Sequence, residues 1–336
     1  LWIFLLNLPF GLLSIWFVRD AFPSRVTTET RSFDMPGALL LVLSYGALVF
    51  SVSVGGDLFE WTDPLVLIGL TGGAVLLAAF VAQELRSSDP VMPLRLLRIP
   101  VVRASSATTL LIGSVNFMAV AFLPLMLQVV SGVGSTEAGL ALLPTTFGIA
   151  ITSTIVGRLV VRTGHYRIWP AVGSAIFAGG YFVLAGLGSD PSMTMVWLGT
   201  GLLGLGMGAG SPVFMLSMQN AVPHRDVGVV SAMAMFARNT GQAFGVALGG
   251  ALFVGRLSHH LDRLVPAERL NGLDVDDLRG DIDAIRGLEP DIEALASDAF
   301  RLAVTDVFTF AAWGAVISMV VALTIPQLPL RETIDD

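Results

Sequence analysis

Nine apolar stretches, each long enough to cross a bilayer as a helix, follow one another along the chain. They cover about residues 1–18, 35–54, 64–83, 104–130, 138–161, 168–187, 193–218, 227–254 and 304–326. A bilayer-spanning helix needs roughly 20 mostly apolar residues, and nine such helices could not share one water-soluble core. Only 13% of the 336 residues are charged, against about 25% in soluble domains. The sequence therefore predicts an all-α integral membrane protein.

Arginine in the short loops predicts the orientation of these helices. Arginines recur in the loops after the first, third, fifth and seventh stretches, and none occurs in the loops after the second, fourth and sixth. Short cytoplasmic loops of membrane proteins are enriched in Lys and Arg, so these loops and the C-terminus are predicted to be cytoplasmic. The acidic loop at about 255–303 is then extracytoplasmic. We expect short amphipathic helices in it; the bland alternative is a solvated acidic hairpin without a function of its own.

Arg238 is the charged residue that we place nearest the middle of the membrane. It follows Val227, where its stretch begins, by roughly 16 Å at 1.5 Å per residue. Gln242 projects from the same helical face. Because an ionisable side chain in hydrocarbon is costly, Arg238 is expected to face the protein interior. It either forms a polar patch on a central cavity or binds backbone carbonyls to fix helix packing.

Other side chains are candidates for a substrate cavity or for proton coupling. The further cavity candidates are Asn116, Phe117, Met215 and Trp313. Large apolar and methionine side chains suit an adaptable pocket, but each also suits plain helix packing. Asp306 and Glu137 stand at the outer ends of their stretches and are candidates for proton coupling. Acids at these positions are also common as solvated groups at the positive end of a helix dipole.

Two glycine patterns predict close helix packing. Gly199, Gly201 and Gly204 formally match a dinucleotide-binding fingerprint, but that motif needs a preceding strand and a βαβ unit, which the sequence does not predict. Small residues that let helices approach closely explain the pattern better. The same holds for glycines at every fourth position of the eighth stretch, namely Gly241, Gly245 and Gly249.

The sequence gives no sign of an enzyme, a metal site or a cofactor. It has no cysteine, and its four histidines lie in predicted loops without metal-binding spacing. It also lacks a phosphate-binding loop for ATP. The net charge of −7 gives no support to nucleic-acid binding.

Several segments, in order along the chain, resemble the fourteen-helix drug:proton antiporters of the major facilitator superfamily, the EmrB/QacA type. These segments are IFLLNLPFG, FDMPGALLL, DPVMPLRLLR, FLPLMLQVVSGVGSTEAGLALLP and NAVPHRDVGVVSAMAMFARNTGQAFGVALGG. The resemblance implies that the nine stretches are helices six to fourteen and that about five helices precede them. Residues 1–30 would then end the N-terminal bundle, 31–100 would form a two-helix insert, and 101–336 the C-terminal six-helix bundle with its loop at 255–303.

The resemblance extends to a cytoplasmic gate loop. Its residues here are Gly157, Arg158, Arg162, Gly164 and Arg167. Val161 stands where the superfamily usually has an aspartate, which weakens a charge lock in this half of the protein.

The resemblance implies a secondary active exporter of the bacterial inner membrane. It would move small amphipathic or cationic molecules against protons by alternating access, energised by the proton gradient and without a cofactor or metal. Its partners would be the substrate, the lipid bilayer and the missing N-terminal bundle. Export of a self-made antibiotic or metabolite, uptake, and a non-transporting receptor on the same fold remain alternatives.

Overall fold

The computed structural model describes residues 34–329 apart from 56–58, 60–61, 88 and 266–289, together with residues 9, 11, 13, 14 and 17. Those five residues are helical and belong to a separate unit, Leu1–Phe33. The stretch predicted at residues 1–18 therefore lies mostly outside the described residues. All that follows concerns the second unit, which begins at Asp34.

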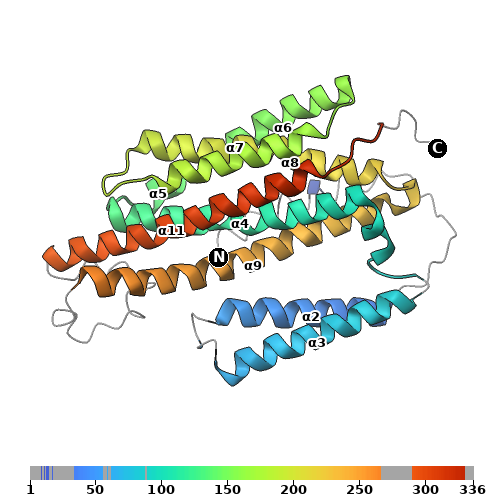
Figure 1. Cartoon of the computed structure of the whole chain (residues 1–336), viewed down its shortest axis with the longest axis horizontal. Coiled ribbons are helices and arrows are strands. Elements are labelled where there is room, and N and C mark those ends of the chain that lie inside the picture. Colours follow the sequence, from blue (N-terminus) through green and yellow to red (C-terminus); the bar gives the residue numbers. More distant parts are fainter. Residues whose placement is uncertain are drawn as a thin grey trace. The chain divides into compact units, whose positions relative to one another are not determined.

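Helices make up almost all of the described part of this unit (Figure 1). The only pairing of β type there is an isolated bridge between Gly55 and Phe59. Two short 3₁₀ helices, η1 (Leu94–Arg98) and η2 (His224–Asp226), lie in loops. The α-helices are α2 (Met35–Val54), α3 (Pro64–Arg86), α4 (Pro100–Val130), α5 (Ser135–Leu140), α6 (Leu143–Thr163), α7 (Ile168–Ala185), α8 (Met193–Asn220), α9 (Val227–Leu264) and α11 (Pro290–Leu323).

Seven spans in the described residues are long and apolar enough to cross a bilayer. They are α2, α3, α4, α7, α8, α11 and the combined α5–α6 segment Ser135–Thr163. The eighth predicted stretch forms α9, which is 38 residues long but is not among the seven. We attribute this to Arg238, Asn239 and Gln242, because these polar residues in the middle of α9 lower its mean hydropathy. The predicted all-α membrane fold is confirmed.

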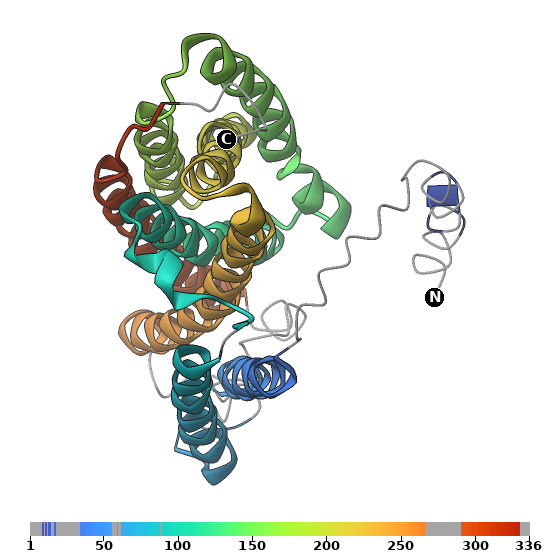
Figure 2. The ribbon, with the colours of Figure 1, turned by 90° about the vertical axis from the view of Figure 1, so that its right-hand side faces the viewer.

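Five of these spans, α4, α6, α7, α8 and α11, pack together with α9 as a bundle. Helix α8 packs against α6 and α7, and α4 packs against α9 and α11 (Figure 2). A buried aromatic group lies where α7 meets α11, with the ring of Tyr181 5.4 Å from that of Phe177 and 6.0 Å from that of Phe308. The Tyr181 hydroxyl also donates to the Val115 carbonyl oxygen and accepts a hydrogen bond from the Ala119 N–H, both on α4. The hydroxyl is therefore satisfied away from water, as a buried polar group requires.

The α2–α3 hairpin lies beside α9. The two helices pack on each other, and Tyr45 of α2 contacts Phe236 of α9 with ring centroids 5.4 Å apart. Most other large apolar side chains of the hairpin are exposed, as expected for helices that contact lipid. The predicted domain boundaries at residues 30 and 100 stay predictions.

The bounds predicted for the loop at 255–303 are wrong at both ends. Helix α9 continues to Leu264 and α11 begins at Pro290. The extensions are stabilised by packing, because Leu257 and Leu261 are buried in the same core cluster as Ile292 and Phe300. At 1.5 Å per residue α9 is about 57 Å long, well beyond the roughly 30 Å of bilayer hydrocarbon. The amphipathic helices predicted between these ends fall on residues outside the described part.

The described short loops that bear arginine, between α3 and α4, between α6 and α7 and between α8 and α9, lie at one end of the bundle (Figure 1), which we call the arginine end. Arg95 in η1 forms an ion pair with Asp226 at the start of α9. Residues 326–329, which follow α11, bind the α6–α7 loop and the end of α8 through Tyr166 and Asn220. The loops after α4 and α7 lie at the opposite end, as the alternation of arginine predicts.

Candidate functional site

A small polar crevice lies where α4, α8 and α9 meet. It brings together three of the predicted cavity residues, Asn116, Arg238 and Gln242. The complete lining is Thr109, Ile112, Gly113, Asn116, Met207, Ser211, Phe214, Arg238 and Gln242. We call this group the polar crevice. Five of its nine side chains carry polar groups, although the three helices are otherwise mainly apolar.

Close contact between α4 and α9 positions these side chains. A Cβ atom added to Gly113 would lie 2.6 Å from the Arg238 carbonyl oxygen, and one added to Gly245 would overlap the Ser114 carbonyl. The prediction that the glycines of α9 serve close packing is confirmed for Gly241 and Gly245. In α8, a Cβ on Gly199 would clash with Leu184, and one on Gly204 would clash with Thr145, so these two glycines also serve close packing. The third glycine of that pattern, Gly201, has space for a Cβ.

The Arg238 side chain is exposed on the surface of the bundle, and so is that of its neighbour Asn239. No ion pair or hydrogen bond of the guanidinium occurs among the described residues. Arg238 lies roughly 16 Å from the start of α9, close to half of the hydrocarbon thickness. Since a guanidinium facing lipid at that depth is unfavourable, this part of the surface must face water or another protein segment.

The polar crevice itself is too small for a substrate. Its volume is about 10 Å³, which is at the lower limit for a single water molecule. The Thr109 hydroxyl beside it is buried and has no hydrogen-bond partner in the described part of the chain. The crevice is therefore a polar wall, and any larger cavity must be completed by a segment packed over Arg238.

The other cavity candidates lie elsewhere. Phe117 is on the exposed surface of α4, next to Asn116 in sequence. Met215 packs against a hydrophobic cluster near the arginine end that contains Leu96 and Val230. Trp313 of α11 contacts Phe182 of α7 in a T-shaped pair, with ring centroids 5.9 Å apart. The structure thus does not bring Met215 or Trp313 to the polar crevice.

Of the two proton-coupling candidates, Asp306 has basic neighbours. Its Oδ2 lies 3.0 Å from His260 Nε2 and 3.5 Å from Arg256 Nε, both on α9. Glu137, in contrast, lies exposed in the first turn of α5. Arg256 and His260 were not among the predicted site residues, because both fall in the range predicted as a loop. Their spacing of four residues, which places them on one helical face, was the available signal.

The predicted gate loop is the turn between α6 and α7. Arg158 and Arg162 lie exposed on the last turns of α6, and Gly164 ends that helix with a left-handed φ of 70°. A backbone with φ in this range favours glycine. Arg167 occupies the position before α7.

The segment after α11 binds this loop through four hydrogen bonds, which together we call the tail clasp. The Tyr166 hydroxyl donates to the Pro326 carbonyl at 3.2 Å and accepts from the Leu328 N–H at 2.9 Å. The Gln327 side chain accepts from the Arg167 N–H at 3.0 Å and donates to the Gly164 carbonyl at 2.7 Å. Burial raises the pKa of the Tyr166 phenol, opposed in part by its hydrogen bonds. The sequence analysis did not predict the clasp, because its partners are about 160 residues apart.

Buried carboxylates hold the other loops at the arginine end. Asp226, whose side chain is 5% exposed, binds Arg95 at 3.3 Å. Glu84 of α3 is buried and accepts hydrogen bonds from two consecutive backbone N–H groups, those of Val91 and Met92, each at 3.1 Å. At the start of α2, the N–H of Gly37 donates to Asp34 and lowers the pKa of that carboxyl.

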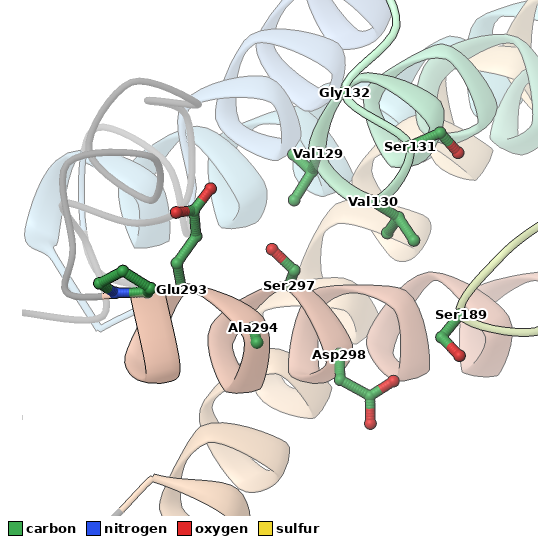
Figure 3. A pocket seen from close by; sticks show the side chains of 10 residues that line it. Val129, Val130, Ser131, Gly132, Ser189, Glu293, Ala294, Ser297 and Asp298 are labelled. Atoms are coloured by element: carbon green, nitrogen blue, oxygen red, sulfur yellow. The ribbon is translucent and has the colours of Figure 1, made fainter.

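A larger pocket, of about 520 Å³, lies at the opposite end (Figure 3). It lies between the end of α4, the α7–α8 turn and the start of α11, and is lined by Ser131, Ser189, Glu293 and Asp298 among others. Arg301 neutralises Asp298 at 2.7 Å. Its lining residue Pro290 follows directly in sequence on residues 266–289, which lie outside the described part, and we assign the pocket no function.

Comparisons with known proteins agree with this architecture. A family model described as Major Facilitator Superfamily matches residues 1–246. An uncharacterized transporter of this type from Mycobacterium tuberculosis is 29% identical over 335 residues, which is 100% of this chain and 48% of the relative.

Two further relatives carry names that refer to drugs. The multidrug transporter protein MdtP of Bacillus subtilis is 29% identical over 269 residues, covering 79% of this chain and 49% of the relative. The multidrug resistance protein Stp of Mycobacterium tuberculosis is 32% identical over 269 residues, with the same coverage. The chain thus spans about half the length of the relatives that it matches.

A solved structure has the same fold. The inward-facing, occupied form of a bacterial homologue of the human lysosomal transporter Spinster superposes with a TM-score of 0.57 at 16% identity, covering 88% of this chain and 67% of the other. At that identity the likeness concerns the fold alone. The family match covers well over half of the residues, and the helices pack as a membrane-spanning bundle. This multi-pass membrane protein belongs to the major facilitator superfamily.

Proposed function

We propose that the chain supplies helices six to fourteen of a fourteen-helix, proton-coupled exporter of small amphipathic or cationic molecules. The N-terminal bundle of the same protein would cover the polar crevice and complete a substrate cavity over Arg238. The observation that carries the proposal is the exposure of Arg238 and Asn239 near mid-membrane depth. Binding at the midplane between two bundles is the general arrangement of such transporters.

Three further observations support the proposal. The chain spans about half the length of its relatives, and the other half of such a relative is long enough to hold a second helical bundle. Two of the relatives are named for multidrug transport or resistance. Arginine-bearing loops share one end, which supports a cytoplasmic position for that end and for the C-terminus in the bacterial inner membrane.

Efflux by the full-length protein in proteoliposomes tests the role of Arg238. We expect Arg238→Gln to reduce ethidium transport at least about tenfold, because one lost charge-assisted contact is worth roughly 1.5–3 kcal/mol. Arg86→Gln, at an exposed arginine in the last turn of α3, is the matched control and should transport normally. Arg238→Gln protein that transports at the wild-type rate contradicts the proposal, and an unchanged rate combined with lower thermal stability assigns Arg238 to packing.

Proton coupling is tested separately. Transport should stop when the pH gradient is collapsed. Asp306→Asn removes the carboxylate partner of Arg256 and His260 and so tests the coupling candidate that has basic neighbours. Efflux that survives complete collapse of the gradient eliminates antiport but leaves the substrate cavity intact.

A further inference from the structure

A second pocket, which we call the interface pocket, lies at the arginine end between the start of α7 and the end of α11. It measures about 580 Å³ and is lined by His165, Arg167, Ile168, Leu323 and Gln327. Pockets for small molecules usually measure roughly 300–1,000 Å³. None of the five lining residues is acidic. The polar crevice is formed by other helices, so the interface pocket is not part of it.

The tail clasp holds the walls of the interface pocket in place. Gln327 binds the loop backbone at both Gly164 and Arg167, so its side chain is fixed between the two helices. The Arg167 side chain is exposed, and among the described residues its guanidinium has no hydrogen bond or ion pair. His165 Nδ1 lies 2.7 Å from the Thr163 carbonyl oxygen, which requires the proton on Nδ1. The other ring nitrogen of His165 is left for a ligand or for solvent.

An apolar stripe leads away from the interface pocket along α11. Its members are spaced by three or four residues, share one face of the helix and are each more than half exposed: Trp313, Ile317, Val320 and Leu323. From Leu323 to Trp313 the stripe is about 15 Å long at 1.5 Å per residue. That length equals about half of the bilayer hydrocarbon, the depth of one leaflet. Phe182 of α7 packs on the far end of the stripe through its contact with Trp313.

We propose that the interface pocket binds one anionic phospholipid of the adjoining leaflet. The Arg167 guanidinium and the His165 ring would hold the phosphate, and one acyl chain would lie along the stripe of α11. A guanidinium is well suited to phosphate because it offers several N–H donors in a fixed plane. An amphipathic ligand is favoured over a free anion because the cationic group and the leaflet-long apolar stripe are continuous.

The bound lipid would contact residues of the tail clasp, which joins the segment after α11 to the α6–α7 loop. Its headgroup would therefore contact the loop that resembles a gate, on the side of the bundle away from the polar crevice. This inference does not depend on the identity of the transported substrate.

Lipid retention by the purified full-length protein tests the proposal. After reconstitution in equal amounts of phosphatidylglycerol and phosphatidylcholine and controlled delipidation, native mass spectrometry would count the lipids that remain bound. The wild type should retain phosphatidylglycerol in preference, and Arg167→Gln should lower that preference about fivefold, since one arginine near an anionic surface contributes about 1 kcal/mol. Arg167→Lys should restore part of it, and Arg162→Gln should leave it unchanged.

Two further measurements separate a lipid from other occupants. Trp313→Ala should weaken retention of both lipids, because it removes the end of the apolar stripe. Inorganic phosphate at millimolar concentration should not displace phosphatidylglycerol.

Three results would overturn the proposal. Equal losses in Arg167→Gln and Arg162→Gln would show only a diffuse effect of surface charge. Displacement by inorganic phosphate would indicate a site for free anions. Residues 331–336 include Glu332 and Asp335. Phosphatidylglycerol that is retained only after these residues are deleted would show that the acidic end of the chain, and not a lipid, occupies the pocket.

Discussion

A matched pair of glycines in α8 provides a quantitative test of the helix packing. A Cβ added to Gly206 would lie 2.5 Å from the Gly173 carbonyl oxygen and 2.6 Å from the Phe177 nitrogen, both in the backbone of α7. Ordinary contact begins at about 3.4 Å, so Gly206→Ala must separate α7 from α8 by roughly 0.9 Å or strain both helices. A Cβ on Gly201 in the same helix meets only Pro144, at 3.8 Å. That position has room for alanine.

The two substitutions have the same intrinsic effect on the helix. Glycine to alanine in a helix interior is favourable by roughly 0.8–1 kcal/mol, and this contribution cancels when the two variants are compared. Overpacking of a dense interior costs typically about 1–3 kcal/mol. Gly206→Ala should therefore be less stable than Gly201→Ala by about that amount.

Thermal unfolding of the full-length protein in detergent, followed by the loss of the monodisperse peak in size-exclusion chromatography, measures this difference. We expect Gly206→Ala to unfold at least about 2 °C below Gly201→Ala. If the two variants unfold at the same temperature, or Gly206→Ala is the more stable, the close approach of α7 and α8 is not as described.

The remaining predictions concern the arginine end. Tyr166→Phe removes two clasp hydrogen bonds, the one donated to the Pro326 carbonyl and the one accepted from the Leu328 N–H. Hydrogen exchange in residues 325–329 should accelerate, because the local stability falls by about 1–3 kcal/mol. Because burial raises the pKa of Tyr166 above its usual 10.0, its contribution is complete below pH 10 and is lost as the pH rises through the folded-state pKa. Wild-type stability should thus decline in that alkaline range through a component that Tyr166→Phe lacks. Arg95→Gln should cost about 1 kcal/mol or less, since that side chain is 59% exposed. A double-mutant cycle of thermal stabilities combines Arg95→Gln with Asp226→Asn. The double variant should lose less stability than the sum of the two single variants, and strictly additive losses would contradict the ion pair.

The membrane-spanning helices could be predicted because their signal is local. Bilayer thickness sets the length of an apolar stretch, and arginine placement gave the alternation that the loops show. The glycine pattern of α9 was equally readable, since a spacing of four places small side chains on one helical face. The cavity candidates Arg238 and Gln242 lie together for the same reason, since they are four residues apart on α9. Asn116 joins them through the packing of α4 on α9.

The features that were missed depend on contacts between distant parts of the chain. The outer ends of α9 and α11 carry charged residues such as Arg256 and Asp298, so their hydropathy resembles that of a loop. They are nevertheless helical because Leu257 and Phe300 are buried between them. The pairing of Arg95 with Asp226 joins residues 131 positions apart, and the contact of Trp313 with Phe182 is equally non-local. No spacing rule in a single sequence identifies such partners.

The tail clasp has a practical consequence for anyone who labels this protein. Residues 325–329 look like a disposable linker in the sequence, yet Gln327 binds two loop backbone groups and Asn220 donates to the Pro329 carbonyl. A fluorescent or affinity tag fused directly after Leu323 would remove these bonds and free the turn between α6 and α7. Fusions that begin beyond Pro329 should report on the native protein.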